Sequence, residues 1–164
     1  MHIAERLRAG GLIADTADLA DGRPVSEILA GTALVVVVAA VRYGRHMAPA
    51  ERFLAAYRTQ PSAPPLALAS VNLTARKPDK QTAETNPYLK KLIEKHGLQP
   101  VTAAAFAGKL DYPKYRWVDR QMIRLIMWLT GGPTDGTSSV DYTSWESVDA
   151  FADAVMAAAQ AKAD

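Results

Sequence analysis

The sequence predicts an α/β fold in which a doubly wound parallel sheet lies between two layers of helices. Residues 34–40 read Leu-Val-Val-Val-Val-Ala-Ala, a β-branched run without polar alternation that is typical of a strand buried on both faces. Residues 65–71 and 101–110 are further apolar runs of strand length. Helix signals separate these runs, and a helix is the usual connection between neighbouring parallel strands.

Composition bounds the class of protein. The chain has 164 residues, which predicts a single domain, and a formal net charge of +2, which does not indicate a nucleic-acid partner. It has no cysteine, which excludes a disulfide framework, an iron–sulfur cluster and a thiolate nucleophile. The three histidines, His2, His46 and His96, lack the spacing of metal ligands. We therefore predict no metal site and expect each histidine to be a solvated or capping residue.

Four strands are expected, at residues 12–17, 34–40, 65–71 and 101–110. The last three should be parallel neighbours in that order, since each connection is long enough for a right-handed crossover. Five helices are expected from glycine, proline and capping signals: residues 3–9, residues 24–29, a helix that begins at residue 48 and ends before Pro61, a helix that Asn86 caps and His96-Gly97 closes, and a last helix that opens at a capping box of Thr143 and Glu146.

Polar and aromatic residues follow three of the expected strands. Because the carboxyl ends of parallel strands meet at one edge of a sheet, these residues are candidates for a ligand site. Such an edge can hold a flat heteroaromatic cofactor by stacking and by hydrogen bonds, although the same residue types are also common in ordinary turns. The candidates are Arg42, Tyr43 and Gly44; Ser70, Val71, Asn72 and Leu73; and Gly108, Lys109, Leu110 and Asp111.

A long insertion, at about residues 112–132, separates the last strand from the last helix. On a helical wheel Arg116, Arg120 and Arg124 form one stripe, with an apolar face opposite. Together with Lys114, and with Trp117 and Trp128 at the border, this pattern suits a helix that lies on a membrane surface. It equally suits a helix that packs its apolar face on the domain and leaves the arginines solvated.

At these motifs the chain resembles a known family, the menaquinone-dependent protoporphyrinogen IX oxidases of bacteria. The resemblance rests on residues 70–78, 112–117 and 122–127, with support from residues 41–44 and 131–135, and it runs from about residue 3 to the last helix. It implies a flavodoxin-like fold with FMN as cofactor and protoporphyrinogen IX as substrate. The electrons would pass to menaquinone, in a late step of haem synthesis.

The resemblance also assigns places to the candidate residues. The three strand ends would surround the ring of FMN. Lys114, Arg116, Arg120 and Arg124 would attract the propionates of the substrate or anionic lipid headgroups. The protein would then be peripheral, on the cytoplasmic face of the inner membrane. No general acid or base stands out in the sequence, and a homo-oligomer is left open.

The chain departs from the family at its start. Flavodoxin-like chains begin with a strand and a Ser/Thr-rich loop that holds the FMN phosphate at a helix N-terminus. Met1 falls inside the helix that follows this loop in the family, so the first strand and the phosphate loop are absent. We expect that the true start codon lies upstream. Alternatively, the first two strands pair with each other again, or the chain is a degenerate paralogue.

Two other functions stay open. A soluble electron carrier of the flavodoxin type would carry a strongly acidic docking face, whereas this chain is slightly basic. A membrane-surface protein without a cofactor would keep the basic insertion but bind no flavin. Absorbance of the purified protein distinguishes the last function from the others, because bound flavin absorbs near about 450 nm.

Overall fold

The protein is described by a computed structural model, which covers residues 2–111 and 139–161. The chain forms two compact units, one of residues 1–107 with 144–164 and one of residues 108–143.

The first unit is built on a four-stranded sheet of order β2-β1-β3-β4. β1 (Val35–Arg42), β3 (Leu66–Val71) and β4 (Thr102–Phe106) are parallel neighbours, with Val37 opposite Leu68 and Leu68 opposite Ala103. The predicted order and direction of these strands are confirmed. β2 (Arg45–His46) is a two-residue strand antiparallel to the end of β1.

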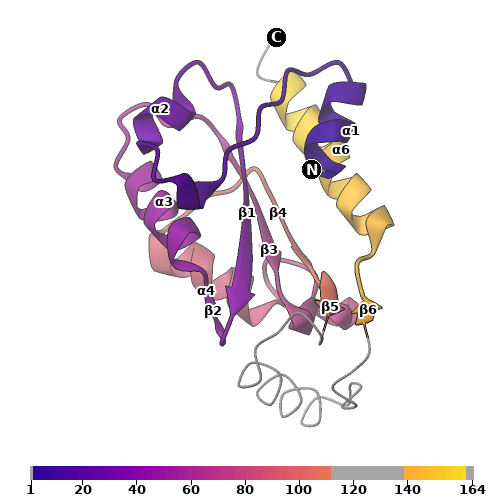
Figure 1. Cartoon of the computed structure of the whole chain (residues 1–164). Coiled ribbons are helices and arrows are strands. Elements are labelled where there is room, and N and C mark those ends of the chain that lie inside the picture. Colours follow the sequence, from indigo (N-terminus) through magenta and orange to yellow (C-terminus); the bar gives the residue numbers. More distant parts are fainter. Residues whose placement is uncertain (1, 112–138, 162–164) are drawn as a thin grey trace. The chain divides into compact units, whose positions relative to one another are not determined.

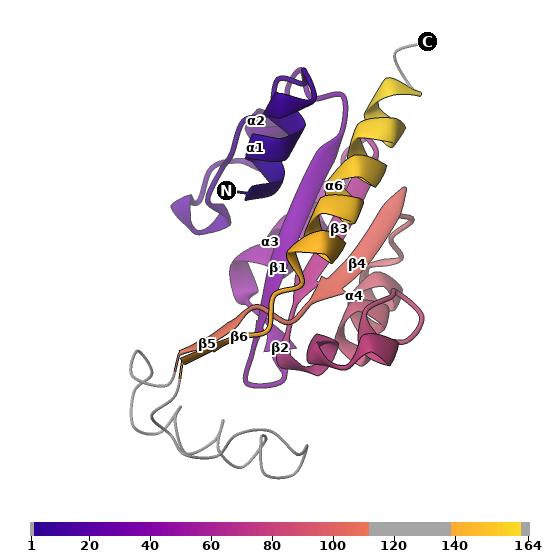
Figure 2. The same cartoon turned by 90° about the vertical axis from the view of Figure 1, so that its right-hand side faces the viewer.

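Helices cover both faces of this sheet, as the sequence predicts (Figure 1). One face carries α2 (Val25–Leu29), α3 (Ala48–Arg58) and α4 (Pro87–His96). The other carries α1 (His2–Ala9) and α6 (Trp145–Gln160), which lie side by side in both Figure 1 and Figure 2. Short 3₁₀ turns, η1 (Leu19–Asp21), η2 (Leu73–Arg76) and η3 (Pro78–Lys80), fill three of the connections.

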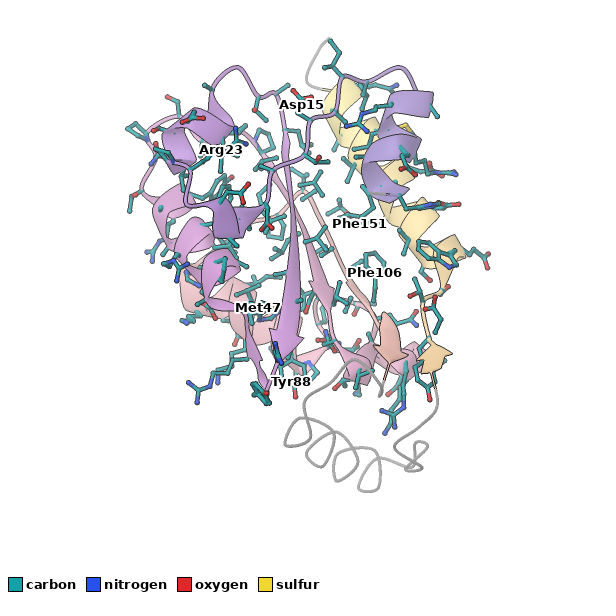
Figure 3. All side chains as sticks on the ribbon, viewed as in Figure 1. Asp15, Arg23, Met47, Tyr88, Phe106 and Phe151 are labelled. Carbon is teal, nitrogen blue, oxygen red and sulfur yellow. The ribbon has the colours of Figure 1, made fainter. Side chains whose placement is uncertain are left out.

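Each face of the sheet has its own apolar core. Val35, Val37 and Ala39 point toward α3 and α4, where Leu54 and Leu89 are fully buried. On the opposite face Phe106 of β4 meets Phe151 of α6 edge to face, with ring centroids 5.7 Å apart (Figure 3). β3 is buried over nearly its whole length, because it has a strand on each side and helices on both faces.

The strand expected at residues 12–17 is not present, so this prediction was wrong. Leu12 and Ala14 pack against the core under α6, but Ile13 between them is 98% exposed. Among the described residues β1 pairs with β3 along its length and with β2 only at Val41 and Arg42. The apolar residues Leu12 and Ala14 are therefore partly buried by packing beside helices, in a segment that joins no ladder.

The strand expected at residues 101–110 is shorter than predicted. β4 ends at Phe106, and Gly108 has φ +71°, a left-handed conformation that turns the chain away from the strand direction. Beyond it, β5 (Lys109–Asp111) belongs to the second unit, where it pairs antiparallel with β6 (Ser139–Asp141). The predicted insertion at residues 112–132 lies outside the described residues.

The cap of α6 lies one residue later than predicted. Ser144, and not Thr143, is the N-cap: its Oγ accepts the backbone N–H of Ser147 at 3.3 Å. The two serine hydroxyls also lie 2.9 Å apart. The predicted capping box pairs Thr143 with Glu146, three residues later. In the structure the cap is Ser144, and its partner three residues later is Ser147.

The displaced cap gives a direct prediction. Ser144→Ala should lower the free energy of unfolding by about 1 kcal/mol, because the N–H of Ser147 loses its acceptor. Thr143→Ala is the matched control and should change it by less than about 0.5 kcal/mol. Chemical denaturation of both variants measures the difference, and a larger loss for Thr143→Ala would show that Thr143 is the cap.

Candidate functional site

The carboxyl ends of β1 and β3 lie at one edge of the sheet, and two segments follow them there. The first is a hairpin, Arg42 to Arg45, that joins β1 to β2. The second is residues 72–76, which leave β3 and enter η2. Met47, just after β2, and Tyr88, in the first turn of α4, lie at the same end of the sheet (Figure 3). The two segments bring together the site residues predicted on β1 and β3.

The hairpin turn is tight and has an unusual sequence. Both of its central residues have left-handed backbones, Tyr43 with φ +52° and Gly44 with φ +74°. This is the pattern of a type I′ turn, which normally takes Asn-Gly or Gly-Gly. Because Tyr-Gly is not one of these pairs, the sequence contains no sign of a hairpin here, and β2 was not predicted. A tyrosine held at positive φ is conformationally unfavourable, which is typical of functional sites.

The turn presents an aromatic ring at the surface. The Tyr43 side chain is half exposed, and the guanidinium carbon of Arg42 lies 5.2 Å from the centre of its ring. No heavy atom lies within 4 Å of the place where a side chain on Gly44 would begin. An exposed ring beside open space can stack on a flat ligand, and the neighbouring cation can attract a negatively charged one.

The end of β3 is polar but turned inward. Ser70 and Asn72 are buried, and the Nδ2 of Asn72 donates to the Oγ of Ser70 at 2.9 Å. Asn72 also exchanges hydrogen bonds with Asn86, whose Nδ2 donates to Asn72 Oδ1 at 3.0 Å. The side chains of Ser70 and Asn72 therefore bond within the protein, while Val71 and Leu73 are partly buried. Of these four residues, only Val71 and Leu73 are partly open to a ligand.

Two of the three histidines are buried beside this network, contrary to the prediction that they would be solvated or capping. His46 Nε2 lies 2.9 Å from Ser70 Oγ. His96 Nε2 lies 2.6 Å from Glu51 Oε2, which also accepts from Lys95 Nζ at 2.7 Å. His2, by contrast, is exposed and pairs with Asp149.

Burial and charge act differently on these groups. Burial lowers the pKa of His46 below its ordinary value, with further lowering from Lys95 and His96 and an opposing effect from Glu51. Burial alone would raise the pKa of Glu51, but the hydrogen bonds from Lys95 and His96 outweigh it and hold that pKa below its ordinary value. At neutral pH the edge of the sheet thus contains a neutral His46 beside an ionised Glu51.

The remaining predicted site residues lie elsewhere. Gly108, Lys109, Leu110 and Asp111 belong to the second unit, where Tyr142 N donates to Gly108 O in the β5–β6 ribbon. The six residues predicted to contact substrate or membrane lie outside the described residues: Lys114, Arg116, Trp117, Arg120, Arg124 and Trp128.

Sequence reasoning missed His46 and the wider role of Asn86. Asn86 was predicted as a helix cap, and its Oδ1 does accept from the N–H groups of Tyr88 and Leu89. Its second role, in joining α4 to β3, has no local signal, because Asn72 lies fourteen positions away. The described residues contain no cluster of three metal-ligating side chains, and none of their helices is long and apolar enough to cross a membrane.

Comparison with known proteins agrees with the topology. The family described as a flavodoxin domain matches residues 1–137. A protein of Escherichia coli strain K12 named protoporphyrinogen IX dehydrogenase (quinone) is 45% identical over 118 residues, which are 72% of this chain and 65% of that protein. A Leishmania major protein of the same name is 42% identical over 138 residues, 84% of this chain and 59% of that protein.

The matches span less than two thirds of the length of either relative. No solved structure matches the chain with significance. The flavodoxin-domain match covers well over half of the sequence, and the parallel sheet with helices on both faces is the architecture that such a domain requires. The chain therefore belongs to the flavodoxin-domain family.

Proposed function

We propose that this protein oxidises protoporphyrinogen IX to protoporphyrin IX in haem biosynthesis, with FMN as its cofactor and menaquinone as the electron acceptor. The observation that carries the proposal is the 42–45% identity to relatives named protoporphyrinogen IX dehydrogenase (quinone). The flavodoxin domain supports a flavin, and the name of the relatives supports a quinone acceptor. FMN and menaquinone in particular follow from the resemblance of the motifs.

The residues at the edge of the sheet fit the flat ring of a flavin. The half-exposed ring of Tyr43 offers a stacking surface, and the space beside Gly44 leaves room for the ligand to approach the backbone. When bound, the flavin would take electrons from the porphyrinogen and pass them to the quinone. The chain's own part is to orient the ring: Tyr43 would cover one face, and the segment after β3 would border it.

The remaining parts of the proposal concern residues outside the first unit. The resemblance of the motifs is the ground on which Gly108, Lys109, Leu110 and Asp111 are proposed to contact the flavin. The cationic and aromatic residues of the insertion are proposed to hold the substrate propionates or an anionic membrane surface. The protein is likewise proposed to lie at the cytoplasmic face of the inner membrane, where it would meet its quinone.

The first test is flavin binding by the purified chain. Titration with FMN should quench the flavin fluorescence, and protein separated from free FMN should still absorb at about 450 nm. Anaerobic protoporphyrinogen IX should then yield fluorescent protoporphyrin IX only when a naphthoquinone is added. Flavin binding without porphyrin formation would favour the electron-carrier function. Absence of flavin binding, with vesicle binding retained, would favour a membrane-surface protein without a cofactor.

The turn residue Tyr43 gives a prediction in which stability and function change in opposite directions. Tyr43→Asn creates the Asn-Gly pair that type I′ turns prefer, so the free energy of unfolding should rise by about 0.5–1 kcal/mol. The same variant loses the aromatic stacking surface, so FMN affinity should fall about tenfold. Urea denaturation and fluorescence titration measure the two effects on the same sample.

A matched control separates stacking from general loss of an exposed ring. Trp145 is as exposed as Tyr43 but begins α6, where its ring lies 4.8 Å from that of His2. Trp145→Ala should leave FMN affinity unchanged. If Tyr43→Asn stabilises the protein and leaves FMN affinity intact, the strained turn has another role and the flavin does not stack on Tyr43.

A further inference from the structure

A directed chain of hydrogen bonds runs from α4 to the β1–β2 hairpin, and its direction follows from the backbone. The N–H groups of Tyr88 and Leu89 can only donate, so the Asn86 atom that faces them must be its oxygen. Asn86 Nδ2 then donates to the carbonyl of Lys80 at 2.8 Å and to Asn72 Oδ1. This fixes Asn72 in turn, with its Nδ2 as a donor to Ser70 Oγ.

The chain of donors ends at a hydroxyl whose own proton needs an acceptor. Ser70 Oγ already accepts from Asn72, and Ser70 is fully buried, so water cannot take the proton. Among the described residues, the remaining hydrogen-bond partner of this oxygen is His46 Nε2, at 2.9 Å. His46 itself is buried, with 8% exposure. The Ser70 hydroxyl has both a donor and an acceptor when His46 Nε2 accepts its proton, which requires the ring proton of His46 to be on Nδ1.

We propose that His46 is a positioning residue: its unprotonated Nε2 accepts the hydroxyl proton of Ser70 and so locks the β1–β2 hairpin to the end of β3 and the N-terminus of α4. The contact matters because the hairpin carries Tyr43, three residues before His46. The relevance of this contact to catalysis rests on the proposed flavin site at this edge of the sheet. The hydrogen bond between His46 and Ser70 does not depend on that proposal.

The lock is sensitive to protonation. A proton on Nε2 turns the acceptor into a donor, which leaves the proton of Ser70 without a partner and places a charge in a buried site. The charged groups that face His46 are Glu51 on α3, which favours the protonated form, and Lys95 and His96 on α4, which oppose it. Burial opposes it most strongly.

Protonation of His46 makes the stability of the fold depend on pH. The pKa of His46 in the folded protein lies below the ordinary value of 6.5, so the unfolded chain binds more protons in this range. The stability that neutral His46 contributes is complete above that ordinary value and is lost as the pH falls toward the lowered pKa of the folded state. As this stability is lost, the hairpin should become less ordered, and the affinity for FMN should fall.

The tautomer can be measured without any ligand. In the full chain with ¹⁵N-labelled histidine, the ring signals of His46, assigned by their absence from His46→Gln, should show the proton on Nδ1 at neutral pH. They should move to the doubly protonated form only below the ordinary histidine pKa of 6.5. A proton on Nε2 at neutral pH, or a pKa of His46 at or above that ordinary value, would overturn the proposal.

The positioning role needs a second readout. In His46→Gln the side-chain oxygen can accept the Ser70 proton but cannot be protonated, so FMN affinity at pH 7 should be preserved and its decline at acidic pH should disappear. His46→Ala should weaken FMN binding about tenfold at pH 7, because the buried hydroxyl loses its acceptor. His96→Gln removes an equally buried histidine outside the hydrogen-bond chain and should keep the affinity at pH 7. Because His96 opposes protonation of His46, its loss should move the acidic decline toward higher pH.

The outcomes separate the two proposals. If the wild-type chain binds no FMN, the proposed function fails, while the tautomer and titration of His46 still decide the hydrogen-bond inference. If FMN binds and His46→Gln keeps the acidic decline, or His96→Gln weakens binding as much as His46→Ala, His46 does not position the site.

Discussion

Replacing Asn86 by Ala is expected to lower the free energy of unfolding by about 3–5 kcal/mol, a large share of the stability of a small domain. The side chain is fully buried and joins three parts of the fold: the first turn of α4, the carbonyl of Lys80 and Asn72 at the end of β3. Its removal leaves buried donors and acceptors on each of these parts without partners. Urea denaturation at pH 7 measures the loss.

Two variants divide this loss into its parts. Asn86→Ser keeps a hydroxyl that can cap α4 but removes the amide, so it should recover only about 1 kcal/mol of the Asn86→Ala loss. Thr85→Ala changes the preceding residue, whose hydroxyl bonds locally to Thr82, and should cost less than about 0.5 kcal/mol. If Asn86→Ser is as stable as the wild type, Asn86 acts as a cap alone and the network contributes nothing to stability.

The strands that could be predicted from the sequence are those whose pattern has a local cause. Residues 34–40 and 65–71 form strands because β-branched and small apolar side chains fill both faces of a covered parallel sheet. The segment at residues 12–17 begins with three apolar residues, yet Leu12 and Ala14 pack beside helices and the segment joins no strand. Hydrophobic periodicity shows which side chains are buried, and it does not show whether the backbone has a neighbour to pair with.

The site residues predicted on β1 and β3 lie at one edge of the sheet, but the contacts of their side chains were not predicted. Tyr43 and Gly44 were recognised as residues at a strand end, whereas the type I′ turn was hidden because tyrosine rarely occupies it. Ser70 and Asn72 were predicted to contact a cofactor. Their side chains meet His46 and Asn86, which come from distant positions in the sequence. Such contacts depend on the assembled fold, so no local pattern could indicate them.

Replacing Arg116, Arg120 and Arg124 together by Gln is expected to release the protein from anionic vesicles. The three arginines recur every four residues in the sequence, so a helical conformation would place them in one stripe. Each cation near an anionic surface contributes about 1 kcal/mol, so the three together correspond to roughly a hundredfold change in partition. Co-sedimentation with vesicles of graded anionic lipid content measures it.

A charge-matched control tests whether position, and not only net charge, is responsible. Arg23, Arg52 and Arg58 are exposed in the first unit, and replacing them by Gln lowers the formal net charge of +2 by the same three units. This control should stay bound to the vesicles, and both variants should keep their flavin content. High salt should weaken wild-type binding, because exposed charges are screened within about 10 Å. If sedimentation does not depend on lipid charge, or if both variants are released alike, the insertion is not a membrane-binding surface and its apolar face packs on the domain.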